Sequence, residues 1–380
     1  MSLYESTPRL DLPSLPNFKQ LSKTVWRVLG LNPGKFTLQG TNTYIVGSGK
    51  RKILIDCGDG QPDYLPLLMH SLKSIDPDAY ISDILISHCH TDHCGGLKDI
   101  LSSEINRPPL DTSSSFISSR QYQQQQFINI HKYPLDTDKG WYKVFWESLK
   151  ELPDDTTFSD LKDNQVFTLR NEKDKDSPPL HIRVMHTPGH AKDHCAFYLE
   201  EEDILFTGDC ILGHGSVAFE DLHDYMKSLQ RMEKLQPARL FPGHGDVVED
   251  SIQKIHQYIA ARRVKENQIL DILRQDVRVH WTPIELVEFM SSNGSHSSSS
   301  HSQSSRKREY SEPLAAVAVR NVGLHLIKLY FDGKVELTNL ADYRKRHGKD
   351  LDPYHSENVY TIMNEKWRYI DTNEHNNSKL

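Results

Sequence analysis

The sequence predicts an α/β fold, and two observations carry that prediction. Short β-rich runs alternate with helix-like segments such as FEDLHDYMKSLQRMEKL at 219–235, an alternation that favours a mixed core over an all-β one. Four β-rich runs end in turns that carry His or Asp, near residues 88, 190, 209 and 244. Because loops at one edge of a sheet can bring distant residues together on a rigid scaffold, these turns are expected to converge.

The elements of the first part follow from local pattern. Residues 44–56 contain two β-rich runs around a Gly-Ser-Gly turn, which predicts a hairpin. A helix-like segment follows near 63–73. The apolar run at 81–87 leads directly into HCHTDH, and two glycines then precede LKDILSS. This order indicates strand, loop and helix, and similar strand-to-turn transitions recur at TPGH, TGDC and FPGHG.

Two stretches have a different composition. Residues 104–178 combine a Ser- and Gln-rich stretch, the aromatic patch GWYKVFW and NEKDKDSPP, which we interpret as an irregular insertion into the first domain. The Ser/His-rich segment at about 292–308 has almost no apolar residue with which to offset the entropy of ordering. It is therefore expected to be a disordered loop.

The C-terminal part has its own signals. Thr282, Pro283 and Glu285 form a capping box with proline at the first helical position. A second helix is expected at about 313–331, ended by an Asp-Gly pair before the strand-like KVEL. We therefore expect three parts: a catalytic domain at 1–260, a small winged-helix-like domain at 261–340, and a polar tail at 341–380.

Composition narrows the functional classes. The 380 residues are 37% hydrophobic and contain no run of twenty apolar residues, so no membrane span is expected. Five cysteines in no framework spacing, behind an N-terminus without a secretory signal, indicate a reduced, intracellular protein. The net charge is −7, with about +2 in residues 261–380 and about −9 in the rest. Any nucleic-acid binding would therefore need a local basic patch.

The His- and Asp-bearing turns predict a metal centre. HCHTDH supplies four closely spaced donors, and TPGH, TGDC and FPGHG add three more, each beside a glycine that permits close backbone approach. Imidazole and carboxylate donors suit zinc. The predicted ligands are His88, His90, Asp92, His93, His190, Asp209 and His244.

Seven donors exceed the needs of one tetrahedral ion, so two zinc ions sharing Asp209 are expected, with a bridging hydroxide as the nucleophile. Asp92 and Asp209 are the expected catalytic carboxylates. Asp56, at the end of ILID, is expected to orient a ligand histidine, with turn capping as its alternative role. The remaining nearby residues are expected to pack around the site: His186, His194, His214, His223, Cys89, Cys94 and Cys210.

With these motifs in place, the chain resembles the metallo-beta-lactamase superfamily. Three longer stretches are similar to the beta-lactamase-like protein 2 family: LNPGKFTLQGTNTYIVG at 31–47, GDCILGHGSVAFEDLHDYMKSL at 208–229 and GLHLIKLYFDGKV at 323–335. The resemblance implies an αββα sandwich. It also implies one metal on His88, His90 and His190, a second on Asp92, His93 and His244, and Asp209 between them.

The same resemblance implies a function. Members of the family are mitochondrial endoribonucleases that cleave single-stranded RNA, which implies a mitochondrial matrix location, with the cytoplasm as the alternative. Fungal relatives are thioesterases that release polyketides from carrier proteins. An endoribonuclease is our first hypothesis, and a thioesterase or glyoxalase II-like hydrolase of acyl thioesters is the alternative, because the metal motifs are common to both.

Substrate contacts are less constrained by the sequence. Arg320 and Lys328 are weak candidates for binding RNA, together with further cations and a group of aromatic residues. The alternative interpretation is that the cations lie on a solvated helix face and the aromatic residues only pack. The other members of this set are Arg262, Arg263, Lys265, Trp141, Tyr142 and Trp146. The intact ligand set argues against a non-catalytic binding module, and His90 argues against a diiron redox protein. The short spacing between Asp209 and His244 excludes a beta-CASP nuclease.

Overall fold

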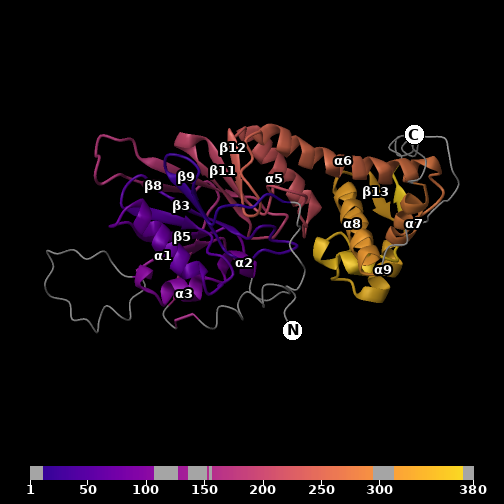
Figure 1. The fold of residues 1–380 in the computed structure, drawn as a ribbon. Coiled ribbons are helices and arrows are strands. Elements are labelled where there is room, and N and C mark those ends of the chain that lie inside the picture. The colour runs from indigo at the N-terminus through magenta and orange to yellow at the C-terminus, as the bar shows by residue number, and fades with distance from the viewer. Residues whose placement is uncertain (1–11, 107–126, 136–151, 154–155, 294–311, 371–380) are drawn as a thin grey trace. The chain divides into compact units, whose positions relative to one another are not determined.

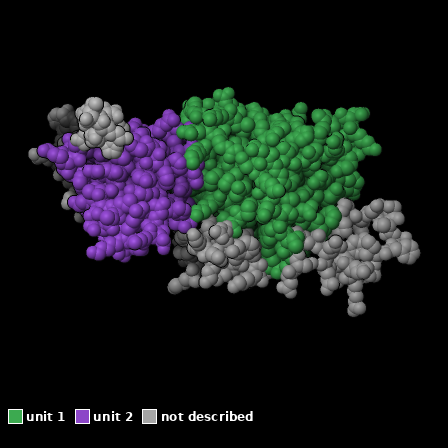
Figure 2. Space-filling model, turned by 180° about the vertical axis from the view of Figure 1, so that it is seen from behind, with its two compact units in different colours: residues 1–219, 227–256 green, residues 220–226, 257–380 purple. Residues whose placement is uncertain are grey.

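The computed structural model describes residues 12–106, 127–135, 152–153, 156–293 and 312–370. The chain divides into two compact units, which are distinguished by colour in Figure 2: residues 1–219 with 227–256, and residues 220–226 with 257–380. In the described ranges, no helix has the length and apolar character needed to cross a membrane.

The first unit contains two sheets (Figure 1). Seven strands form the first sheet, in the order of the chain: β1 Phe18–Gln20, β2 Val25–Leu29, β3 Asn42–Val46, β4 Arg51–Ile55, β5 Tyr80–Ile86, β6 Asn129–Lys132 and β7 Phe158–Asp160. Strands β1 to β4 pair antiparallel, and β4 to β7 pair parallel. The hairpin expected at 44–56 is β3 and β4.

The second sheet has five strands in the order β12-β11-β10-β9-β8. Its strands are β8 Val166–Leu169, β9 Leu180–His186, β10 Cys195–Leu199, β11 Ile204–Gly208 and β12 Arg239–Pro242. Strands β8 to β11 pair antiparallel, whereas β11 and β12 are parallel. The carboxyl ends of β9, β11 and β12 carry the turns TPGH, TGDC and FPGHG.

The two sheets pack face to face through a shared apolar core. The ring of Tyr44 lies 5.0 Å from that of Phe206 and 5.7 Å from that of Phe241, which joins β3 to β11 and β12. Each such buried aromatic contributes roughly 1.5–3 kcal/mol to stability. The rest of this core comes mainly from β2 to β5 on one side and from β8 to β12 on the other.

Helices cover the outer faces of the two sheets. Helices α1 (Tyr64–Ile75) and α3 (Leu97–Leu101) pack on the first sheet in a second apolar core. Helix α5 (Leu222–Leu235) contacts the end of β9, because Arg231 donates a hydrogen bond to the carbonyl oxygen of His186. This helix–sheet–sheet–helix order confirms the expected αββα fold.

The second unit is mainly helical. Its elements are the later part of α6 (Ser251–Gln275), α7 Pro283–Asn293, α8 Glu312–Phe331, β13 Val335–Leu337, α9 Leu340–His347 and β14 Trp367–Tyr369. The predicted capping box is present, because the Thr282 amide donates to the Glu285 carboxylate at 2.7 Å and the Glu285 amide donates to Thr282 Oγ1 at 3.1 Å. An additional C-terminal helical region therefore accompanies the αββα core.

Two expectations about irregular segments were too broad. Residues 104–178 contribute β6 and β7 to the first sheet and β8 to the second, so the described part of this segment belongs to the core. Residues 340–370 belong to the second unit, where Trp367 in β14 is fully buried and pairs with Leu337 of β13. The Ser/His-rich segment falls almost entirely on residues 294–311, outside the described residues.

Candidate metal centre

All seven predicted ligands come from the carboxyl ends of strands and meet in the first unit. His88 and His90 follow β5, and Asp92 and His93 lie in the short helix α2 (Thr91–Cys94). His190 follows β9, Asp209 follows β11, and His244 follows β12. The first sheet therefore provides four of the side chains and the second sheet provides three.

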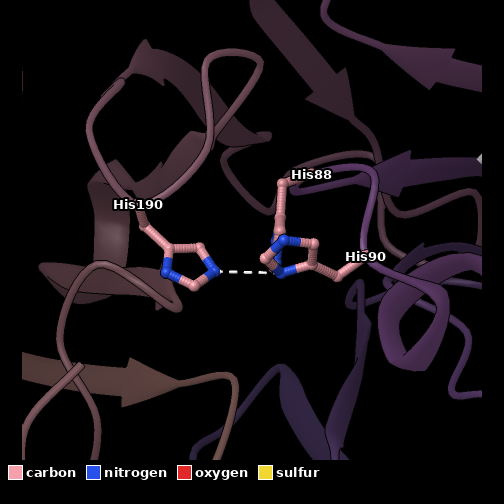
Figure 3. A group of neighbouring side chains, drawn as sticks. All are labelled: His88, His90 and His190. Atoms are coloured by element: carbon pink, nitrogen blue, oxygen red, sulfur yellow. Dashed lines mark hydrogen bonds between the residues drawn. The ribbon is translucent and has the colours of Figure 1, made fainter. Parts of the chain in front are cut away.

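Three histidines form one end of the cluster. Figure 3 shows the rings of His88, His90 and His190 with their nitrogen atoms facing one another. His90 Nδ1 lies 2.9 Å from His88 Nε2 and 3.1 Å from His190 Nε2. One ligand atom from each residue lies within 4.8 Å of the others, a grouping that can hold a metal ion.

Asp92, His93 and His244 form a second group of the same kind. His244 Nε2 lies 3.1 Å from Asp92 Oδ2 and 3.3 Å from His93 Nε2. His93 and His244 are buried, and the Asp92 carboxylate is 16% exposed. This group offers two nitrogens and one oxygen, a donor set that fits a divalent ion such as zinc.

Asp209 lies between the two groups. Its Oδ2 is 3.3 Å from His244 Nε2 and 3.7 Å from His190 Nε2, and its Oδ1 is 3.4 Å from His93 Nε2. Oδ1 is buried, and no described group donates a hydrogen bond to it. A buried carboxylate oxygen without a donor is costly unless a cation balances it. The residues therefore fit a pair of metal ions with Asp209 shared.

The charges of the cluster are divided between its two ends. Burial and the neighbouring imidazoles hold the pKa of His88 well below its usual range, and burial lowers the pKa of His190 to about 4. Burial also opposes charge on His244, but the Asp209 and Asp92 carboxylates raise its pKa to about 9. The same carboxylates, together with Asp56, raise the pKa of His93. Positive charge is thus favoured beside Asp92 and Asp209.

The position of Asp56 fits the orienting role expected for it. Its Oδ2 lies 2.8 Å from His93 Nδ1, and its two oxygens accept hydrogen bonds from the amide and hydroxyl of Ser87. The other nitrogen of His93, Nε2, consequently faces Asp92, Asp209 and His244. On the opposite side, His190 Nδ1 contacts the carbonyl oxygen of Ala218 at 2.8 Å, which leaves its Nε2 facing His90.

Gly243 explains why the FPGHG turn needs a glycine. A Cβ at this position would lie 2.6 Å from Asp209 Oδ1 and 2.9 Å from His93 Cε1. Such distances are far below van der Waals contact, and both neighbours are predicted ligands. The absence of a side chain therefore lets this turn approach the centre of the cluster.

The remaining predicted residues lie elsewhere. His214 is exposed, and the ring of His223 lies beside that of Phe331 in the second unit. Lys328 is 13% exposed, and its ammonium group is 2.8 Å from Glu266 and 2.9 Å from Asp332, so two carboxylates neutralise it. Arg320 is half-buried in α8. Trp141, Tyr142 and Trp146 fall outside the described residues.

The structure also reveals a buried ion pair that sequence reasoning missed. The Lys132 ammonium lies 2.6 Å from the carboxylate of Asp193, three residues after His190. Lys132 ends β6, in the segment interpreted from the sequence as an irregular insertion. The available signal was the Asp three positions after TPGH, but nothing in the sequence connects it to Lys132.

Comparison with known proteins gives consistent results. Residues 36–244 match the metallo-beta-lactamase superfamily. The chain is 35% identical to a beta-lactamase-like protein 2 homolog of Drosophila melanogaster over 86% of its length and 95% of that protein. It is 36% identical to an atrochrysone carboxyl ACP thioesterase of Aspergillus novofumigatus over 72% of its length and 70% of that protein. A crystal structure of a beta-lactamase domain protein from Burkholderia ambifaria shares the fold, with a TM-score of 0.62 at 14% identity and 97% coverage of both chains.

Proposed function

Because this chain belongs to the metallo-beta-lactamase superfamily, we propose that it is a dinuclear zinc-dependent hydrolase that cleaves single-stranded RNA. The observation that carries the metal-dependent part is the convergence of seven donors around Asp209. His88, His90 and His190 would hold one ion, and Asp92, His93 and His244 the other. Asp209 lies where it would contact both.

Two zinc ions, when bound, would lower the pKa of water toward neutrality and stabilise negative charge that develops on a phosphate. The chain's own residues supply the framework for this chemistry. Burial favours the neutral forms of His88 and His190, and a neutral imidazole has a nitrogen lone pair that is free to coordinate a metal ion. Asp56 fixes the ring of His93, so its Nε2 points inward.

A loop beside His244 supports RNA as the substrate. Thr41 forms an isolated β-bridge with His244, and the chain from Asn32 to Thr41 turns back on itself at Phe36. Phe36 is 78% exposed, and the Lys35 ammonium lies 5.7 Å from the centre of its ring. An exposed aromatic next to a cation matches a nucleobase and its phosphate, since single-stranded nucleic acids bind through stacking and charge.

The loop is held in place by its own hydrogen bonds. The Gly34 amide donates to the Leu38 carbonyl at 3.1 Å, and Thr37 Oγ1 donates to the Asn32 carbonyl at 2.6 Å. The Asn32 side chain accepts from the Thr41 amide at 2.8 Å. Phe36 and Thr41 are five positions apart in the sequence, so their Cα atoms are at most roughly 18 Å apart. The exposed ring is therefore within reach of a strand that enters the metal centre.

A second candidate function is hydrolysis of acyl thioesters. The observation that favours it is the 36% identity to a fungal protein named as an acyl carrier protein thioesterase. The seven donors serve either reaction, because a phosphoester and a thioester both develop negative charge on oxygen during hydrolysis. Contacts outside the metal centre must separate the two.

The experiment compares two substrates on zinc-loaded protein. An unstructured, end-labelled RNA and an acyl thioester are each incubated with the wild type and with Asp209→Asn. Internal cleavage of the RNA that Asp209→Asn abolishes supports the proposal. Efficient thioester turnover with intact RNA, again lost in Asp209→Asn, overturns it in favour of the thioesterase. Activity that survives unchanged in Asp209→Asn comes from a contaminant and contradicts both.

A further inference from the structure

A buried ion pair connects the two sheets next to His190. Lys132 is the last residue of β6 in the first sheet, and Asp193 lies in the turn between β9 and β10 of the second. The Lys132 ammonium is 2.6 Å from Asp193 Oδ2, with the lysine side chain 6% exposed and the aspartate fully buried. The pair therefore joins the first sheet to the turn that carries His190.

The residue after Lys132 contacts the other end of the same turn. The ring of Tyr133 stacks on that of His186, with centroids 3.7 Å apart and planes 3° from parallel. His186 ends β9, four residues before His190. Lys132 also donates a hydrogen bond to the carbonyl oxygen of Tyr133 at 3.0 Å, which ties the two contacts together. Two consecutive residues thus hold both ends of the segment 186–193.

This segment determines where His190 lies relative to His88 and His90. Those two histidines follow β5, whereas His190 belongs to the second sheet. Strand β6 pairs parallel with β5, and Lys132 is in register with Ile86, two residues before His88. A contact from Lys132 to the turn therefore fixes His190 against the strand pair that leads to the other two rings.

Stability alone gives no reason for the pair. Removing two charges from water costs about as much as their attraction returns, so a buried ion pair is often no more stable than apolar residues of similar volume. What distinguishes the pair is that both charged groups are buried, so neither can leave the contact without leaving the other as an uncompensated buried charge. The pair is suited to holding the turn in one position.

We propose that Lys132 and Asp193 are positioning residues: they hold the 186–193 turn against the end of β6, and so fix His190 in the three-histidine group. The inference rests on the proposed function, because it assumes that metal ions are bound, and it concerns metal affinity rather than the choice of substrate. It predicts that loss of the pair weakens one of two metal positions. The metal position formed by Asp92, His93 and His244 should keep its affinity.

The test measures zinc retained per chain against increasing chelator, together with the melting temperature. The variants are Lys132→Met, Lys132→Arg and the double variant Lys132→Met with Asp193→Asn. Lys132→Met should release one zinc ion at about 10- to 100-fold lower chelator, the range seen when residues that support metal ligands are lost. Lys132→Arg keeps the charge and should retain most of the affinity. The double variant should regain melting temperature but not zinc affinity.

Lys328→Met is the matched control. It also removes a lysine from a largely buried pair, with Glu266 at 2.8 Å in the second unit. It should lower the melting temperature and leave zinc retention unchanged. The proposal is wrong if Lys132→Met retains both ions as tightly as the wild type, or if the double variant regains zinc affinity together with stability. Should Lys132→Met fail to fold, Lys132→Arg and the double variant decide the question. A wild type that binds no zinc instead contradicts the proposed function.

Discussion

The backbone amide of Asp209 donates a hydrogen bond to Nε2 of the buried His194 at 3.1 Å. Burial and the nearby His190 hold the pKa of His194 well below its usual range, so the ring is neutral. Since Nε2 is the acceptor, Nδ1 carries the proton and donates to Thr187 Oγ1 at 2.8 Å. Gly208 leaves space for this contact, because a Cβ there would lie 2.6 Å from His194 Nε2. Asp209 is thus anchored through its own backbone.

Replacing His194 should therefore disturb both stability and metal binding. His194→Leu leaves the Asp209 amide buried without an acceptor, which costs about 1–3 kcal/mol. His194→Gln supplies a carbonyl oxygen and should recover part of that loss. Urea unfolding of the apo-protein and zinc retention of the loaded protein provide the measurements. If His194→Leu is as stable as the wild type and holds zinc equally well, the amide is not anchored by this ring.

Elemental analysis of the reconstituted wild type should give about two zinc ions per chain, because the donors form two groups around Asp209. Asp209→Asn should reduce this content, since an amide oxygen balances no positive charge and the carboxylate faces both groups. Circular dichroism controls for folding of the variant. A wild-type content well under one ion per chain after zinc reconstitution contradicts a dinuclear centre.

The sequence pointed to the residues of the candidate site because each of them follows a β-rich run and belongs to a motif. His190, Asp209 and His244 are read directly from TPGH, TGDC and FPGHG, and β9, β11 and β12 bring them together. The packing of the two sheets, in contrast, could not be predicted from local sequence pattern. Periodicity reports which face of a strand is apolar, but it does not report which sheet covers that face, so the αββα order came from family resemblance.

Local pattern also failed where burial depends on a distant partner. Strand β6 has only four residues and ends in Lys132, a residue type that is rarely buried unless paired. Its partner Asp193 is 61 positions later and shows no pairing signal in the sequence. Strand β14 has three residues, and its Trp367 is buried against a strand 30 residues earlier. Both segments read as polar surface until the pairing is known.

The second unit should lose stability as the pH falls below about 6.5, because His325 is held neutral. Burial, together with the charges of Arg262, Lys265 and Lys328, lowers its pKa to about 3. The unfolded chain, with a histidine pKa of about 6.5, takes up a proton in this window while the folded protein does not. Stability should therefore fall with decreasing pH, by up to about 1.4 kcal/mol per pH unit from this group.

His325→Gln removes the contribution of this one group and should reduce the slope of the profile between pH 6.5 and 5, where most carboxylates remain ionised. The buried His88, His190 and His194, whose pKa values are also lowered, keep their contributions. Urea unfolding of the apo-protein at intervals across that range, followed by the tryptophan signal, measures the slope. Parallel profiles for the variant and the wild type would show that His325 is not the source of the pH dependence.

The loop from Asn32 to Thr41, which turns back at Phe36, yields a prediction about RNA affinity. The fold does not need this ring, because it is 78% exposed and the loop is held by backbone and polar side-chain hydrogen bonds. Stacking of one base on an aromatic side chain is worth about 1–3 kcal/mol. If Phe36 stacks on a base of the bound strand, its loss should weaken RNA binding without affecting the metal centre.

Phe36→Ala should therefore raise the KM for single-stranded RNA about 5- to 100-fold, while zinc content and turnover of a small phosphodiester stay at the wild-type level. Lys35→Ala should lower affinity less and reduce the salt dependence of binding, because one phosphate contact is lost. Tyr360→Ala is the matched control, since it removes another exposed aromatic, 65% accessible, from the second unit. Equal KM values for Phe36→Ala and Tyr360→Ala would mean that the loop does not contact RNA. A KM increase for an acyl thioester instead of RNA would assign the same ring to the acyl group.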